Sequence, residues 1–185
     1  MIEGLLARLK EGGDQICYQD GAHALTYAEC YERVCTLAQA LRRQGNGPVA
    51  VYGHKCAMQF VSILACVAVR RCYIPLDMHM PRKRIEEILA QAGAELVLAN
   101  APLDVPGVAC FSPVSAGAGV SGGGGCLSDG NECAYIIFTS GSTGKSKGVP
   151  ISYENLSHFI AWITQAEELG GFSRREGAEC VVGSV

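Results

Sequence analysis

The sequence lacks a long hydrophobic run. Its longest apolar stretch, residues 60–69, has ten residues and includes Ser62, whereas a membrane-spanning helix needs about 20 apolar residues. The N-terminal segment MIEGLLARLKEGG carries Glu3 and has no continuous apolar core of the kind found in secretory signals. We therefore predict neither a transmembrane helix nor a secretory signal, and expect a cytoplasmic protein.

The sequence also lacks an excess of positive charge. Lys and Arg number 15 and Asp and Glu number 18, which gives a formal net charge of −3 over 185 residues. A general nucleic-acid binder normally carries a basic surplus, so this class is disfavoured. Hydrophobic residues make up 49% of the chain, which is enough to build a core and argues against disorder.

Cysteine is abundant, but the usual metal-binding spacings are missing. No two of the ten cysteines are spaced C-x-x-C, so we predict no zinc site and name no metal ligand. Cys35, Cys66 and Cys72 lie within apolar patterns, where cysteine packs as a small hydrophobic side chain. Without a secretory signal, reduced thiols are the expected state.

Strands and helices alternate along the first part of the chain. Thr26 and Glu29 form a T-x-x-E capping box, and Gly45 and Gly93 follow helical patterns as stop signals. The pattern predicts an α/β layered lobe with a mostly parallel sheet and right-handed crossovers. The predicted helices span residues 2–9, 27–43, 57–70 and 81–92, and the predicted strands span 15–19, a run ending near 25, 48–52, 72–76 and 95–99.

Residues 115–130 hold seven of the 23 glycines, and we predict a flexible loop there. The segment contains a formal G-x-G-x-x-G at Gly117, Gly119 and Gly122. Because three more glycines follow, no helix can begin well at the third glycine, so this is not a dinucleotide site. The predicted regions are an α/β subdomain (1–114), this loop (115–130), a strand–loop–helix unit (131–166) and an irregular tail (167–185).

The segment 139–148, TSGSTGKSKG, carries the chemistry. Glycines allow backbone N–H groups to point inward as an anion nest, hydroxyls donate to phosphate oxygens, and lysines neutralise charge. The segment follows a predicted strand, 134–139, at the sheet edge where α/β folds bind ligands. It is not a Walker A loop, because Thr139 stands at the first glycine position and Gly148 and Pro150 prevent an immediate helix start. The simpler alternative is a solvated Ser/Gly turn. Ser152 is the predicted N-cap of the following helix.

Residues 135–149, YIIFTSGSTGKSKGV, resemble the phosphate-binding loop of the adenylate-forming (AMP-binding) superfamily. Upstream, L-T-Y at 25–27 and CYIPLD at 72–77, followed by Pro81 and Arg84, also resemble that superfamily. The resemblance covers residues 10 to 165. Within it, VYGH at 51–54, residues 60–67 and YIPLD at 73–77 resemble the branch of D-alanine–D-alanyl carrier protein ligases.

The resemblance implies an ATP-dependent ligase. Such an enzyme joins an amino-acid carboxylate, here D-alanine, to AMP with Mg²⁺ and transfers it to a phosphopantetheinylated carrier protein, a step of teichoic acid D-alanylation. By the same resemblance, Thr139, Ser140, Ser142, Thr143 and Lys147 would contact the phosphates, while Gly141, Gly144 and Gly148 would shape the backbone. Lys147 matches the superfamily's lysine before glycine, and we expect Gly148 to turn the backbone so that Lys147 points over the loop.

The superfamily's enzymes are several times longer. By resemblance, we expect the chain to be an N-terminal fragment that is inactive alone, with the catalytic residues beyond Val185. Two alternatives stay open: a fragment of a peptide-synthetase adenylation domain or acyl-CoA synthetase, and a non-catalytic fragment that binds nucleotide or packs against a partner.

Overall fold

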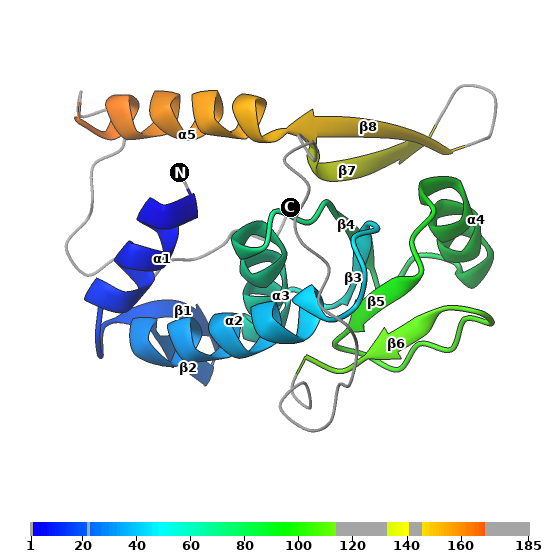
Figure 1. The fold of residues 1–185 in the computed structure, drawn as a ribbon, viewed down its shortest axis with the longest axis horizontal. Coiled ribbons are helices and arrows are strands. Elements are labelled where there is room, and N and C mark those ends of the chain that lie inside the picture. The colour runs from blue at the N-terminus through cyan, green and yellow to red at the C-terminus, as the bar shows by residue number, and fades with distance from the viewer. Residues whose placement is uncertain (1, 22, 114–132, 141–145, 169–185) are drawn as a thin grey trace.

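The computed structural model describes residues 2–21, 23–113, 133–140 and 146–168. Within these residues, a six-stranded sheet has the order β6-β5-β3-β4-β7-β8 (Figure 1). Its strands are β3 Val49–Gly53, β4 Tyr73–Asp77, β5 Leu96–Ala99, β6 Ala109–Phe111, β7 Cys133–Ser140 and β8 Ser146–Ser152. Each neighbouring pair is parallel except β7–β8, which is antiparallel. The predicted α/β class with a mostly parallel sheet is confirmed.

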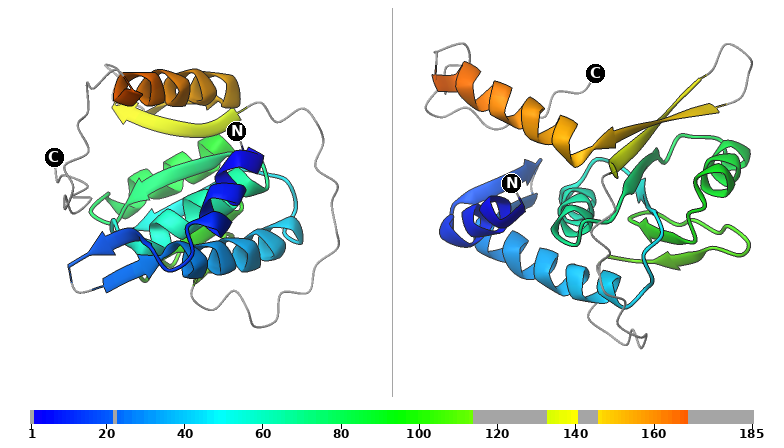
Figure 2. Two further views of the ribbon diagram at one scale, coloured as in Figure 1. Left: turned by 90° about the vertical axis from the view of Figure 1, so that its left-hand side faces the viewer. Right: turned by 45° about the horizontal axis from the view of Figure 1, so that its top comes forward.

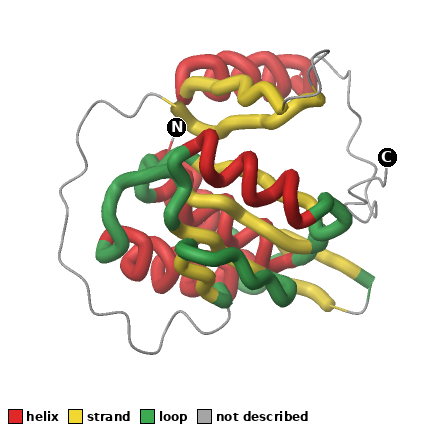
Figure 3. Tube along the Cα trace, turned by 90° about the vertical axis from the view of Figure 1, so that its right-hand side faces the viewer, coloured by secondary structure: helices red, strands yellow, loops and turns green. Residues whose placement is uncertain are grey.

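Helices cover both faces of this sheet, as the alternating side chains of β3 show. Val49 and Val51 pack with α2 (Tyr27–Arg42) and α3 (Ala57–Ala68). Ala50 and Tyr52 pack on the opposite face with α4 (Arg82–Ala92). Figures 2 and 3 show α4 on one side of the strands and α2 and α3 on the other. All five residues of β3 are buried, which explains its continuous apolar sequence.

Before the sheet, α1 (Ile2–Glu11) packs against α2, and β1 (Ile16–Asp20) pairs with β2 (His23–Thr26) as an antiparallel hairpin. Local signals set the helix ends as predicted. Thr26 and Glu29 form the capping box of α2, and Gly93 ends α4 with a left-handed φ of 63°. Pro81, the first residue of the predicted helix 81–92, takes the N-cap position, and α4 begins at Arg82.

Two strands were not predicted. The short strand β6 pairs with β5, and β8 (Ser146–Ser152) begins in residues 146–148, which were predicted as loop. Pro150 is compatible with β8 because this strand is at the edge of the sheet, where one side of its backbone needs no partner. The predicted helix start is confirmed: the Asn155 N–H donates to Ser152 Oγ at 3.1 Å, immediately before α5 (Tyr153–Glu168).

The start of the predicted tail is wrong by two residues, since Glu167 and Glu168 belong to α5. The remainder of the tail and the glycine-rich segment 115–130 lie outside the described residues. No helix in the described part of the chain is both long and apolar enough to span a bilayer.

Candidate functional site

The candidate phosphate loop connects β7 to β8, at one end of their hairpin (Figure 1). Because β7 runs parallel to β4, and β4 to β3, this connection lies at the carboxyl edge of the sheet. Open α/β sheets bind ligands at that edge. Of the predicted site residues, Thr139, Ser140, Lys147 and Gly148 are placed in the two strands, whereas Gly141, Ser142, Thr143 and Gly144 lie outside the described residues.

Thr139 and Lys147 are directly opposite each other in the hairpin, and the Thr139 hydroxyl donates to the Lys147 carbonyl at 3.5 Å. Side chains of opposed residues share one face of a sheet. That face is exposed, since Thr139 and Lys147 are both exposed and the next pair, Ile137 and Val149, is 44% and 40% exposed. The side chains of Thr139 and Lys147 therefore share one accessible face of the hairpin beside the loop.

The opposite face of the hairpin packs toward the core beside α4. Ile136 and Phe138 contact the buried cluster that includes Ile85 and Leu89. Gly148 is opposite Phe138, and a Cβ added there would lie 3.0 Å from Phe138 Cζ and 3.1 Å from Ile136 Cγ2. Gly148 has no positive φ. The expected turn at Gly148 is therefore wrong: this glycine stays in a regular strand and makes room for an aromatic ring.

The backbone after the loop distinguishes this site from a P-loop. Ser146 begins a strand, and the next helix begins only at Tyr153. In a P-loop, the phosphates lie on the N-terminus of a helix that follows directly. The described backbone after the loop therefore does not match a P-loop.

A third buried cluster anchors the hairpin and α5 to the lobe. Val67, Ala134 and Tyr153 form its centre. The rings of Tyr73 and Tyr135 stack with centroids 5.4 Å apart, and the Arg70 guanidinium lies 5.2 Å from the Tyr153 ring centroid. Burial raises the pKa of Tyr73 to about 12, and burial also raises the pKa of Tyr153. Both phenols are therefore neutral at physiological pH, and they serve this contact as packed rings.

Polar residues end three neighbouring parallel strands at the same sheet edge, and none of them was predicted from the sequence as a site residue. His54 follows β3, Asp77 ends β4 and Asn100 follows β5. Both Oδ1 and Nδ2 of Asn100 are buried without a hydrogen-bond partner among the described residues. Gly53 allows the close approach, since a Cβ there would lie 2.7 Å from Asn100 Cβ. Asn100 directly follows the predicted strand 95–99, and a polar residue at that position is the sequence signal that could have identified it.

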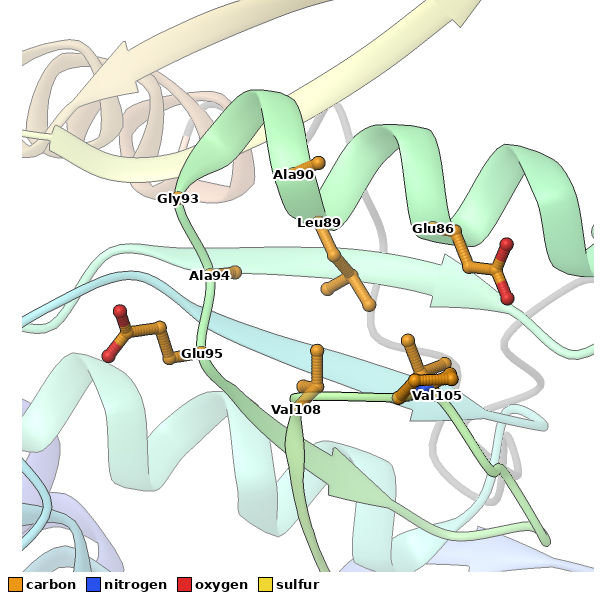
Figure 4. Close-up of a pocket in the computed structure, with 9 residues that line it drawn as sticks. Glu86, Leu89, Ala90, Gly93, Ala94, Glu95, Val105 and Val108 are labelled. Atoms are coloured by element: carbon orange, nitrogen blue, oxygen red, sulfur yellow. The ribbon is translucent and has the colours of Figure 1, made fainter.

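A hollow of about 440 Å³ lies elsewhere, between α4 and the segment that leads into β6 (Figure 4). Leu89, Val105 and Val108 converge on it, while the Glu95 side chain points away. The hollow borders residues 93–95, which precede β5, so it is at the amino edge of the sheet. It is thus at the opposite edge from the candidate loop.

The sequence profile described as "AMP-binding enzyme" matches residues 6–180. The chain belongs to the AMP-binding enzyme family. The resemblance inferred from the loop and the upstream segments is thereby confirmed, and the α/β lobe is part of an AMP-binding domain.

Two relatives show the range within the AMP-binding family. The D-alanine–D-alanyl carrier protein ligase of Bacillus licheniformis is 37% identical over 174 residues, covering 89% of this chain and 34% of that protein. The phenyloxazoline synthase MbtB of Mycobacterium sp. (strain MCS) is 35% identical over 156 residues, covering 81% of this chain and 13% of that protein. The chain therefore spans about a third of the ligase.

Solved structures share the AMP-binding fold. The nonribosomal peptide synthetase FmoA3 superposes with a TM-score of 0.77 at 23% identity, over 93% of this chain and 19% of FmoA3. The O-succinylbenzoate coenzyme A synthetase MenE of Bacillus subtilis, in complex with AMP, gives 0.70 at 18% identity, over 89% of this chain and 45% of MenE. At these identities the likeness concerns the fold alone.

Proposed function

We propose that this AMP-binding chain is the phosphate-binding part of an ATP-dependent ligase that activates an amino acid. A carboxylate oxygen attacks the α-phosphorus of ATP, the bond to the bridging oxygen breaks, and pyrophosphate leaves. The observation that carries the proposal is the pair of Thr139 and Lys147 on one exposed face, beside a glycine- and hydroxyl-rich loop at the carboxyl edge of the sheet.

In this proposal the hairpin stabilises the departing charge. The Lys147 ammonium and the hydroxyls of Thr139, Ser140, Ser142 and Thr143 bind the β- and γ-phosphates, where negative charge increases as pyrophosphate leaves. Gly141 and Gly144 allow loop N–H groups to point toward the same anion. Mg²⁺ is expected to accompany ATP, because it binds phosphate oxygens and neutralises part of their charge.

The proposed substrate is D-alanine, with a phosphopantetheinylated carrier protein as acceptor. Its support is the 37% identity to the D-alanine–D-alanyl carrier protein ligase over most of this chain. A peptide-synthetase adenylation domain is the second candidate, since a linear gramicidin synthase of Brevibacillus parabrevis is 34% identical over 83% of this chain. These identities differ little, so the experiment must separate the two.

Chimeras test both candidates. Residues 6–180 replace the matching segment of the Bacillus licheniformis ligase in one chimera, and of a gramicidin synthase adenylation domain in the other. ATP–pyrophosphate exchange is measured with D-alanine for the first host and with that domain's own amino acid for the second. We expect the chain to support exchange well above background in the ligase host, and more weakly in the synthetase host.

The unmodified hosts serve as positive controls. Comparable or greater exchange in the synthetase host would favour the second candidate. Two folded but inactive chimeras, beside active hosts, would contradict the adenylation function and favour a role limited to nucleotide binding or packing.

A further inference from the structure

Two thiols meet where the hairpin joins the sheet. Cys72 immediately precedes β4 and Cys133 begins β7, and their Sγ atoms are 3.3 Å apart although they are 61 residues apart in sequence. Both cysteines are free. Since a disulfide bond is about 2.05 Å long, an approach of roughly 1 Å would bring the sulfurs to bonding distance.

We propose that Cys72 and Cys133 form a reversible disulfide when the protein meets a small oxidising disulfide, and that this bond fixes the β7–β8 hairpin to the sheet. The proposal is independent of the adenylation function. The two cysteines are far apart in sequence, and the pairing of β4 with β7 brings them together to form the oxidation site.

The difference in exposure between the two thiols determines which of them reacts first. Cys133 is half-buried and so accessible, whereas Cys72 is 4% exposed. The Cys133 thiolate attacks one sulfur of the small disulfide, forming a mixed disulfide and releasing one small thiol. Cys72 then loses its proton and attacks Sγ of Cys133, which releases the second small thiol. The two protein thiols together lose two electrons and two protons, and the small disulfide takes up both.

The second step is intramolecular, and proximity compensates for a weak nucleophile. Burial raises the pKa of the Cys72 thiol, with a further contribution from its contact with Cys133. A thiol of this kind reacts slowly with molecules in solution. Because its sulfur already touches that of Cys133, it needs no diffusional encounter. The pair is therefore inert toward oxidants that do not first modify Cys133.

The position of the bond determines its effect. Strands β4 and β7 are paired in parallel with Tyr73 opposite Tyr135. A covalent link beside this pair would hold in place β7, the strand that leads into the candidate phosphate loop. Closing a loop of this length restricts the unfolded chain, and for a chain of this size we expect the melting temperature to rise by roughly 5–10 °C.

The test incubates the folded chain with oxidised and reduced glutathione at a series of ratios. Remaining thiols are alkylated, and peptides are mapped by mass spectrometry without reduction. We expect the Cys72–Cys133 peptide pair to be the main crosslink, to be lost in dithiothreitol, and to accompany the rise in melting temperature. In Cys133→Ser both effects should disappear, whereas the matched control Cys110→Ser, which replaces an exposed cysteine, should keep both.

Three results would overturn the proposal. One is a main crosslink between other cysteines, for example Cys17 and Cys30, which also contact each other. The second is a Cys72–Cys133 bond that forms only in denaturant. The third is persistent glutathionylation of Cys133 with Cys72 still reduced, which would show that the second step does not occur in the folded protein.

Discussion

Arg71 is a buried cation whose guanidinium is hydrogen-bonded to backbone carbonyls. Its side chain is 3% exposed, and its guanidinium donates to the carbonyls of Gly47 at 2.6 and 3.0 Å, of Leu41 at 3.1 Å and of Gln44 at 3.3 Å. Leu41 and Gln44 lie at the C-terminal end of α2, where the helix dipole favours a cation. Burial lowers the pKa of Arg71, but arginine stays charged. The residue thus joins the end of α2 to the start of β4.

We expect Arg71→Met to destabilise the fold by about 2–4 kcal/mol, because it removes the guanidinium that donates to the buried or part-buried carbonyls of Gly47, Leu41 and Gln44. Urea denaturation monitored by circular dichroism measures the loss. Arg8→Met, which removes an exposed arginine from α1, is the matched control and should change stability by less than about 0.5 kcal/mol. Equal effects of the two substitutions would show that the carbonyls find water instead.

Gly148 provides the space in which Phe138 packs. We expect Gly148→Ala to destabilise the fold by about 1–2 kcal/mol, since the new methyl group would displace the Phe138 ring and Ile136. Gly4→Ala is the control: no atom lies near a Cβ at Gly4, and alanine favours α1, so stability should rise by about 0.5–1 kcal/mol. Thermal denaturation of both variants measures these changes. A Gly148→Ala variant as stable as the parent would mean that the Phe138 ring moves aside at no cost.

Lys147 and Lys145 can be separated by activity. In the active chimera, we expect Lys147→Ala to slow adenylate formation about tenfold to a hundredfold, which corresponds to losing a charge-assisted phosphate contact of roughly 1.5–3 kcal/mol. Lys145→Ala is the matched control and should have a smaller effect. Lys147→Ala should unfold at the temperature of the parent, because Lys147 is exposed. A larger effect at Lys145 would assign the phosphate contact to that residue.

At the scale of secondary structure elements, sequence patterns identified those whose signals are local. The capping box at Thr26 and Glu29 and the left-handed Gly93 mark helix ends, and Gly45 follows the C-cap of α2, Arg43, by two residues. The apolar run of β3 reflects burial on both faces. β8 was missed because its seven residues include Ser146, Gly148 and Pro150, and its strand geometry depends on pairing with β7. Such pairing is a tertiary effect that local propensity does not contain.

The same distinction applies to the candidate site. The hydroxyls, glycines and lysines of the loop were found because they are adjacent in sequence. Asn100 was missed because its burial depends on packing against Gly53 across strands β3 and β5. The meeting of Cys72 and Cys133 was missed for the same reason, since each alone resembles a small core residue.

The capping box of α2 gives a pH-dependent contribution to stability. The backbone N–H of Thr26 donates to Glu29 Oε2 at 2.9 Å, and its hydroxyl donates at 3.1 Å; these bonds lower the pKa of Glu29. A lowered folded-state pKa stabilises the fold above the unfolded value, near 4.3, and the contribution is lost as pH falls through the folded value.

We therefore expect Glu29→Gln to be less stable than the parent at pH 7, with the difference decreasing at pH values below about 4. Urea denaturation at a series of pH values measures this difference. Glu32→Gln removes a charge outside the first turn of the same helix and is the control. A difference that is constant from pH 7 to pH 3 would mean that the carboxylate charge contributes nothing to the cap.

At the scale of the whole molecule, the hairpin and α5 extend from one side of the lobe (Figure 1). On α5, Phe159 and Trp162 are 55% and 61% exposed and stack with ring centroids 6.2 Å apart. The chain spans about a third of the related ligase, and the proposed ligase reaction needs more than a phosphate loop.

The last prediction concerns the chain by itself. We expect the purified 185 residues to show no D-alanine-dependent ATP–pyrophosphate exchange, because the proposed contacts are to the β- and γ-phosphates and no residue of the chain has been assigned to the amino acid. Exchange should appear when residues 6–180 are placed in the ligase host. The isolated chain should still bind pyrophosphate or ATP weakly, and more weakly in Lys147→Ala than in Lys145→Ala, as measured by calorimetry. Robust exchange by the isolated chain would show that it also binds the amino acid and contains the groups that transfer it. The polar residues His54, Asp77 and Asn100, at the same sheet edge, would then be the candidates for binding the amino acid.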